Sequence, residues 1–188
     1  MANYTRDVIR SAFGEMLDRT PFEKITVSAL IKACHIGRNT FYYHYQDIYE
    51  LLDDWLQAVF GRFAADGKET AWEEQMKAFL RTCKANKRKV YHLYNSISRG
   101  RIEQYVFTST GNPITAYIRH LVEGRELPPR RVDGIIDICR YALIGHFLHY
   151  LWTGMDGGID SSVDELSVLL NDIVERMLLQ YEEEDHEC

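Results

Sequence analysis

The spacing of apolar residues is the feature of this sequence that most restricts its possible folds. Near the N-terminus, apolar side chains recur in pairs every four residues, which places them on one stripe of an α-helix. The members of this stripe are Val8, Ile9, Ala12, Phe13, Met16 and Leu17. Helical spacing continues along the chain, whereas the alternation typical of β-strands is scarce. The pattern predicts an all-α protein with about nine helices.

The composition indicates a globular protein. The chain has 188 residues, of which 46% are hydrophobic and 27% are charged, so it can bury a sizeable core. Its four cysteines are widely separated, which argues against a disulfide framework or a zinc site. The N-terminus has no apolar signal core, and no apolar run approaches the roughly 18 residues of a membrane span. We therefore expect a cytoplasmic protein with no metal, no cofactor and no membrane partner.

The charge is unevenly distributed, and the motifs of common enzyme classes are absent. The net charge is −6, yet residues 1–45 carry six basic and four acidic residues, a net of +2. Five acidic residues lie among the last seven positions. The sequence contains no G-x-S-x-G motif, no P-loop and no H-E-x-x-H motif. We therefore predict a weakly basic N-terminal segment followed by an acidic remainder. We also predict that the protein has no catalytic residues and no enzymatic activity.

Two short helices joined by a tight turn are predicted behind the first helix. Thr26 can cap a helix that runs through Ala33, because its side chain can accept a hydrogen bond from the first turn. A turn near residues 34–36 follows, and then a short helix, Gly37–Tyr45. Asp47 can cap the longer helix after it. This arrangement is typical of a helix-turn-helix unit, which binds DNA.

The second short helix carries side chains suited to DNA. Arginine can form two hydrogen bonds with guanine, and asparagine can do so with adenine, so Arg38 and Asn39 are candidates for reading bases. Phe41 and Tyr45 are spaced i, i+4 and can share the buried face. The alternative for Arg38 and Asn39 is a solvated helix face. For the aromatic residues at 42–44 it is core packing.

The sequence from Ile25 to Tyr45 strongly resembles the DNA-binding segment of TetR-family transcriptional regulators. The matching residues are Thr26, Val27, Thr40, Phe41, Tyr42 and the aromatic Tyr45. The resemblance covers roughly the first 60 residues and implies a DNA-binding domain, 1–47, followed by a regulatory and dimerisation domain, 48–188. It also implies that Thr26 and Tyr42 contact phosphate. The candidate DNA-binding residues are Thr26, Gly37, Arg38, Asn39, Thr40, Tyr42, Tyr43 and His44.

The resemblance implies a homodimer that binds a pseudo-palindromic operator in double-stranded DNA, as a repressor released by a small-molecule effector or, alternatively, as an activator. The sequence departs from the family pattern at three positions. His35 replaces the turn glycine, but histidine is among the residues that tolerate positive φ. Gly37 replaces the capping serine, and Ile48 stands where a lysine is common, which predicts a shallower salt dependence. These departures keep open an alternative, a helical protein of this fold controlled by a protein partner.

The second half predicts a regulatory region. The helix from Val132 to Trp152 is apolar nearly all round, which indicates a buried central helix. Gly111-Asn112-Pro113 is expected to interrupt the helix before it. Polar and aromatic side chains could line a pocket for a neutral or cationic aromatic effector, although packed core residues are the commoner interpretation. The candidates are His92, Tyr94, Tyr105, Tyr141, His146, His149 and Trp152.

The last helix, about residues 161–181, has an apolar face broader than one core contact needs. Together with the preceding helix it could form a four-helix interface with a second copy. The predicted interface residues are Gly145, Leu166, Leu170, Ile173 and Met177. The segment Tyr91-His92-Leu93-Tyr94 and the break at Pro128-Pro129 resemble the TetR subgroup that contains activators of dihydroxyacetone kinase operons.

Overall fold

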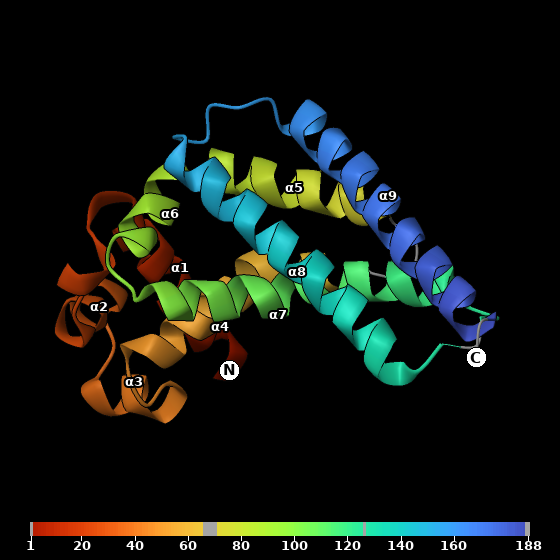
Figure 1. Cartoon of the computed structure of the whole chain (residues 1–188). Coiled ribbons are helices and arrows are strands. Elements are labelled where there is room, and N and C mark those ends of the chain that lie inside the picture. The colour runs from red at the N-terminus through yellow and green to blue at the C-terminus, as the bar shows by residue number, and fades with distance from the viewer. Residues whose placement is uncertain (1, 66–70, 126, 187–188) are drawn as a thin grey trace. The chain divides into compact units, whose positions relative to one another are not determined.

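Helices provide all the regular secondary structure in the computed structural model, which describes residues 2–65, 71–125 and 127–186 (Figure 1). The described residues form nine α-helices and one 3₁₀ helix, so the all-α prediction is confirmed. The elements are α1 (Ala2–Arg19), η1 (Phe22–Lys24), α2 (Val27–Cys34), α3 (Arg38–His44), α4 (Ile48–Ala65), α5 (Trp72–Ala85), α6 (Lys87–Tyr94), α7 (Arg99–Leu121), α8 (Pro129–Trp152) and α9 (Ile159–His186).

The chain divides into two compact units, and neither is continuous in sequence. The first unit comprises Met1–Arg62 and Ala85–Gln104, and the second comprises Phe63–Lys84 and Tyr105–Cys188. By sequence, the first unit has twelve basic and nine acidic residues, a net of +3. The second has ten basic and nineteen acidic residues, a net of −9. The helices at the N-terminus therefore share a basic unit with α6.

Aromatic side chains build the core of the first unit. The ring of Phe13 on α1 meets Phe22 and Trp55 edge to face, with both centroid distances at 6.1 Å. Gly14 makes this packing possible, because a Cβ at this position would lie 2.7 Å from Nε1 of Trp55. The indole of Trp55 on α4 therefore lies directly against the backbone of α1.

Polar contacts attach α6 to the end of α1. Nδ1 of His92 donates a hydrogen bond to the carbonyl oxygen of Leu17 over 2.6 Å. Lys89 forms an ion pair with Asp18 over 3.1 Å. The predicted effector residue His92 thus has a structural partner within the first unit.

The second unit packs α5, α8 and α9 with the later part of α7. The rings of Phe79 and Phe147 lie 5.2 Å apart between α5 and α8. Nζ of Lys77 lies 2.7 Å from the carboxylate of Asp164, and this ion pair connects α5 to α9. The hydroxyl of Tyr117 on α7 donates to Oδ1 of Asn171 on α9 over 2.7 Å. Apolar rings and polar pairs together align these helices.

The expected interruption at Gly111-Asn112-Pro113 was wrong, because α7 runs unbroken from Arg99 to Leu121 with Pro113 inside it. A proline in a helix interior lacks the N–H that would bond four residues back. Here Pro113 is buried together with Ile114 and Ile118. The helix therefore continues through the proline along a face that is packed in the interior.

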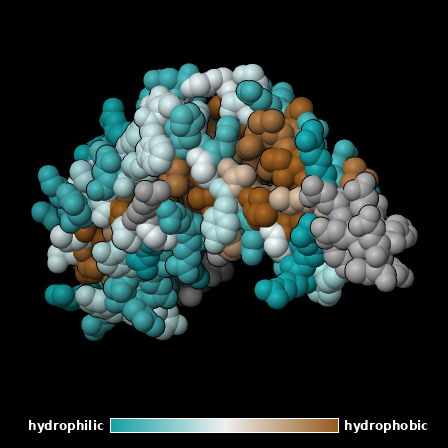
Figure 2. Space-filling model, in the orientation of Figure 1, coloured by the Kyte–Doolittle hydropathy of each residue, from teal (hydrophilic) through white to brown (hydrophobic). Residues whose placement is uncertain are grey.

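The expectation that α8 is buried on all sides was also wrong. One face packs inside the unit through residues such as Leu143 and Phe147. The opposite face is open: Tyr141 is 66% exposed, and Ile138 and Trp152 are exposed as well. Figure 2 shows hydrophobic residues gathered on the surface over α8 and the helices beside it. An apolar sequence pattern identifies two apolar faces but not which of them the chain itself covers.

Candidate DNA-binding site

The turn between α2 and α3 forms by local backbone chemistry. The side chain of Thr26 accepts a hydrogen bond from the backbone N–H of Ala29 over 3.2 Å, which confirms it as the cap of α2. His35 ends that helix in the left-handed conformation, with φ 53° and ψ 41°, as its replacement of a glycine predicts. Gly37 precedes α3 in an extended conformation without a side-chain cap. The result is the predicted helix-turn-helix geometry.

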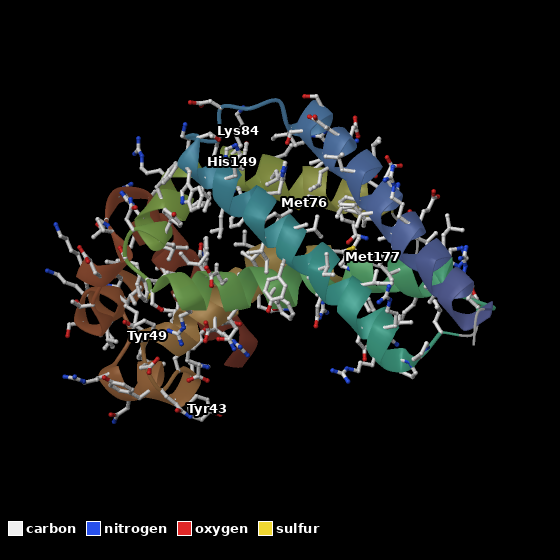
Figure 3. All side chains as sticks on the ribbon, viewed as in Figure 1. Tyr43, Tyr49, Met76, Lys84, His149 and Met177 are labelled. Atoms are coloured by element: carbon white, nitrogen blue, oxygen red, sulfur yellow. The ribbon has the colours of Figure 1, made fainter. Side chains whose placement is uncertain are left out.

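Helix α3 has one buried and one exposed face. Phe41 and Tyr45 are buried, as their spacing predicts. Arg38, Asn39 and Tyr42 are exposed, and Tyr43 is 79% exposed and points outward (Figure 3). Core packing of Tyr42 or Tyr43 is therefore excluded.

The other side chains around α3 lie at its edges. The guanidinium of Arg38 lies 5.8 Å from the ring centroid of Tyr42. Thr40 and His44 are half-buried, and the imidazole of His44 meets the ring of Tyr43 at 5.1 Å. The outer surface of α3 thus offers a guanidinium, an amide and two phenol groups.

A compact cap starts α4 directly after α3. Oδ1 of Asp47 accepts hydrogen bonds from the backbone N–H groups of Tyr49 and Glu50, at 2.8 Å and 2.9 Å, which confirms the predicted cap. The carboxylate of Glu50 accepts from the N–H of Gln46 over 2.5 Å. Ile48 brings a half-buried apolar side chain to this first turn. The chain is therefore held on both sides of the turn that joins α3 to α4.

A cluster of four side chains, here called the Asp54 cluster, lies behind α3. This cluster was not predicted from the sequence. It consists of Arg6, Arg10, Tyr45 and Asp54. Arg6 donates to both carboxylate oxygens of Asp54, over 2.8 Å to Oδ1 and 3.1 Å to Oδ2. The hydroxyl of Tyr45 donates to Oδ2 over 2.6 Å. Nη1 of Arg10 lies 3.6 Å from the same oxygen. The cluster joins α1, the end of α3 and α4.

The environment keeps Asp54 ionised. Burial by itself would raise the pKa of this carboxyl, but the hydrogen bonds from Tyr45 and Arg6 and the charges of Arg6 and Arg10 hold it below its ordinary value. Burial, together with the hydrogen bond to Asp54, raises the pKa of the Tyr45 hydroxyl. The hydroxyl therefore stays a donor and the carboxylate stays an acceptor.

The residues predicted to bind an effector are divided between the two units. His92 and Tyr94 belong to the first unit, and the others belong to the second. His146 is half-buried, with Nε2 hydrogen-bonded to the hydroxyl of Ser162 over 2.9 Å. Burial, reinforced by the neighbouring His149, lowers the pKa of His146. Tyr105 is half-buried, whereas Tyr141, His149 and Trp152 are exposed.

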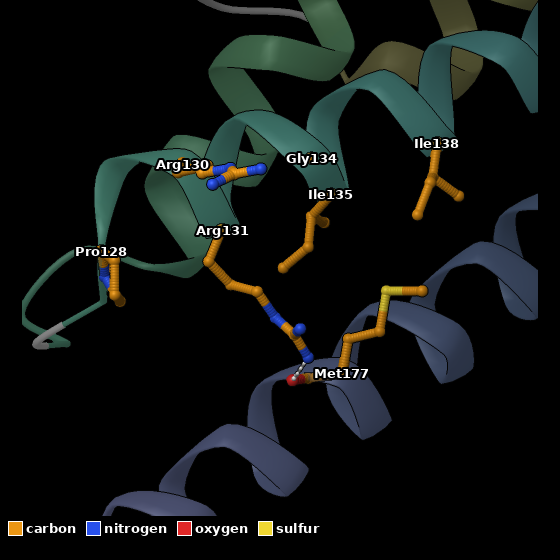
Figure 4. Close-up of a pocket in the computed structure, with 7 residues that line it drawn as sticks. All are labelled: Pro128, Arg130, Arg131, Gly134, Ile135, Ile138 and Met177. Atoms are coloured by element: carbon orange, nitrogen blue, oxygen red, sulfur yellow. Dashed lines mark hydrogen bonds between the residues drawn. The ribbon is translucent and has the colours of Figure 1, made fainter.

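A groove of about 530 Å³ lies between the start of α8 and the later part of α9 (Figure 4). Arg131 reaches across it and donates to the carbonyl oxygen of Met177 over 3.4 Å. The predicted effector residues are not among its lining, which consists of Pro128, Arg130, Arg131, Gly134, Ile135, Ile138 and Met177. Of the predicted interface residues, Met177 lies here.

The other predicted interface residues differ in exposure. Gly145 is exposed, with no atom within 4 Å of the position that a Cβ would take, and Ile173 is 42% exposed. Leu166 is half-buried, and Leu170 is only 4% exposed because it packs inside its own chain. Val168 and Leu169 are exposed instead. The exposed apolar surface of α9 is therefore formed by Val168, Leu169 and Ile173 rather than by Leu170.

Among residues 2–65, 71–125 and 127–186, no helix has both the length and the apolar character that a membrane span requires. Within the same residues, no group of three or more histidine, cysteine, aspartate or glutamate side chains is arranged to hold a metal ion.

Residues 70–172, more than half of the chain, match a TetR family model described as a transcriptional regulator C-terminal region. The chain belongs to the TetR family. The matched region lies outside the helix-turn-helix segment whose sequence resembles the family, so the two observations are independent. No curated protein matches the sequence of this regulator at a significant level.

Solved structures of TetR-type regulators share the fold. The dihydroxyacetone kinase operon activator DhaS is 17% identical with a TM-score of 0.70, covering 91% of this chain and 96% of its own. A TetR transcriptional regulator from Streptococcus agalactiae is 19% identical with a TM-score of 0.67, covering 90% and 94%. A TerR/AcrR family regulator from Aquifex aeolicus is 18% identical with a TM-score of 0.58, covering 90% and 99%.

Proposed function

We propose that this TetR-family regulator is a cytoplasmic protein that binds a pseudo-palindromic DNA operator as a homodimer. The observation that carries the proposal is the division of α3 into two faces. Phe41 and Tyr45 anchor the helix, while Arg38, Asn39 and Tyr43 remain exposed. Arginine and asparagine at the start of a recognition helix can reach base edges in the major groove. A two-fold dimer presents two such helices to two related half-sites.

Phosphate contacts would orient α3 on the duplex. Thr26 is exposed, and its side-chain oxygen already accepts the N–H of Ala29, so its hydroxyl hydrogen can be donated to a phosphate oxygen. The exposed hydroxyl of Tyr42 can act in the same way. Ile48 cannot do so, which supports a shallower salt dependence than a lysine there would give. We assign the half-buried Thr40 and His44 and the cap Gly37 to the edges of the contact.

The dimer would form through α8 and α9. The exposed face of α8 carries Ile138 and Tyr141 around Gly145, and α9 carries Leu169 and Ile173. Large apolar side chains exposed together on adjacent helices favour association with a partner. Gly145 has open space around it, so a helix of the second copy can approach closely.

We further propose that a small-molecule effector releases the operator and that the regulator acts as a repressor. An effector changes DNA affinity only if it binds the two forms of the protein with different affinities. Tyr105 and His146 are the half-buried candidates of the second unit for contact with it. A neutral or cationic aromatic ligand suits their chemistry, and calorimetry would test it. Tight binding of a small polyanion would contradict this expectation.

The experiment that tests DNA binding is selection of duplexes from a randomised pool by the purified chain, followed by mobility-shift titrations. We expect an enriched sequence with two-fold symmetry. Arg38→Ala should reduce its affinity and relax the base preference at one position of each half-site. Arg88→Ala is the matched control, because it removes the same charge from an exposed position on α6. Equal losses for both variants would indicate general charge attraction, and no enriched sequence would refute the proposal.

Activation of transcription is the second candidate function. It is favoured by the similarity of the fold to DhaS, which is named as an operon activator. A reporter gene placed behind the selected operator decides the sign. Expression that rises when the regulator is added supports activation, and expression that falls supports repression.

A further inference from the structure

We propose that Asp54 is a positioning residue for DNA recognition, which acts by holding the end of the recognition helix through the hydroxyl of Tyr45. This inference rests on the proposed function, because it concerns how α3 is presented to DNA. Asp54 lies on α4, and the side chains that bind its carboxylate are those of Arg6, Arg10 and Tyr45. Its side chain is 11% exposed, so it acts from behind the helix.

The recognition helix needs such a fixed end. It contains seven residues, Arg38–His44, and a helix this short is not stable by itself in water. The glycine before it provides no side-chain cap. The buried face is anchored by Phe41 and Tyr45, but packing of Phe41 is apolar and therefore non-directional. The hydrogen bond from Tyr45 has a defined direction and length, and it can fix the rotation of α3 about its own axis.

The Asp54 cluster is built so that this bond has one geometry. Arg6 binds both carboxylate oxygens in the two-pronged arrangement that fixes the plane of the carboxylate. The same guanidinium lies 5.8 Å from the ring centroid of Tyr45. Oδ2 then meets the Tyr45 hydroxyl at 2.6 Å. Arg6 therefore orients Asp54, and Asp54 orients Tyr45.

A small rotation of α3 affects specific and non-specific binding differently. Base-edge hydrogen bonds require side chains at defined places, whereas attraction to phosphates tolerates displacement. Loss of the Asp54–Tyr45 bond should therefore lower affinity for the selected duplex more than affinity for poly(dI-dC). A residue that only stabilises the fold would change the melting temperature and leave the ratio of the two affinities unchanged.

The test compares the full-length wild-type chain with Tyr45→Phe, which keeps the ring and removes the hydroxyl. We expect the affinity ratio between the duplex selected by the wild type and poly(dI-dC) to fall about tenfold, the change expected for one lost charge-assisted hydrogen bond. Tyr117→Phe is the matched control, because it removes a hydroxyl bond of 2.7 Å from the second unit. This control should leave the ratio unchanged.

Two variants at Asp54 test whether this carboxylate acts through the hydroxyl of Tyr45. Asp54→Ala should lower the ratio at least as much as Tyr45→Phe, and the double variant should add little. Asp54→Asn keeps an acceptor for Tyr45 and should recover part of the loss. Wild-type ratios in Tyr45→Phe, or equal losses in Tyr117→Phe, would overturn the inference. A wild-type chain that selects no duplex would instead refute the proposed function, and with it the recognition role of Asp54.

Discussion

The contact between Gly14 and Trp55 predicts that one methyl group destabilises this protein. In Gly14→Ala, the added Cβ would lie 2.7 Å from Nε1 of Trp55, closer than van der Waals contact permits. The indole has little room to retreat, because it is buried and packed edge to face against Phe13 at 6.1 Å. We therefore expect either α1 or the indole to shift within the core of the first unit.

The magnitude follows from two opposing terms. Alanine is favoured over glycine in a helix interior by about 1 kcal/mol. Overpacking of a filled core destabilises by about 1–3 kcal/mol, and here the obstacle is a rigid ring rather than the end of a flexible chain. Because the ring is rigid, we take the upper part of that range, about 2–3 kcal/mol, and expect a net loss of about 1–2 kcal/mol in the free energy of unfolding. This loss corresponds to a decrease of about 2–8 °C in melting temperature.

The matched control is Gly134→Ala on α8, where no atom lies within 4 Å of the added Cβ. Only the helix preference of alanine over glycine applies at that position. We therefore expect the free energy of unfolding to rise by about 0.5–1 kcal/mol. Thermal and urea unfolding followed by circular dichroism would measure both changes. If Gly14→Ala stabilised the protein as much as Gly134→Ala, the close packing of the indole on α1 would not constrain the fold.

Three further predictions concern the interface, the DNA contacts and pH. Ile173→Glu should give folded monomers in light scattering, whereas Leu170→Glu should reduce helical content, since only the first side chain is exposed. A dimeric Ile173→Glu would move the interface elsewhere. Arg38→Ala should reduce the free energy of DNA binding by about 1–3 kcal/mol per half-site and alter the base preference. Tyr42→Phe should instead weaken binding to all duplexes alike. Titrations of operator variants at fixed salt would measure both effects. Burial lowers the pKa of His146 below 6.5, so its neutral form stabilises the fold above that pH and this contribution is lost as the pH falls through the folded pKa. His146→Gln should therefore flatten the pH dependence of stability below about pH 6.5, where the unfolded state begins to take up the proton.

The parts of the site that sequence reasoning predicted depend on neighbours in the chain. The cap at Thr26, the left-handed turn at His35 and the cap at Asp47 each involve residues within a few positions. The buried pair Phe41 and Tyr45 follows from helical spacing alone. Local hydrogen bonds and side-chain periodicity are sufficient for all of these features.

The features that sequence reasoning missed depend on distant partners. Asp54 meets Arg6 across 48 positions, and nothing local distinguishes it from the adjacent Asp53. The course of α7 through Pro113 depends on burial of that face. The open face of α8 could not be recognised because apolar residues look alike whether they pack inside the chain or remain exposed. The attachment of α6 to α1 requires contacts such as that between His92 and Leu17.

The division of the chain into two units has a consequence for its modularity. The chain passes from one unit to the other three times, and each passage lies inside a helix: α4 after Arg62, α5 after Lys84 and α7 after Gln104. A single proteolytic cut therefore releases neither unit intact. A chimera that exchanged only the first 62 residues would combine the α1 of one parent with the α6 of another. Exchange of the whole first unit between relatives by recombination would require two separate segments to move together.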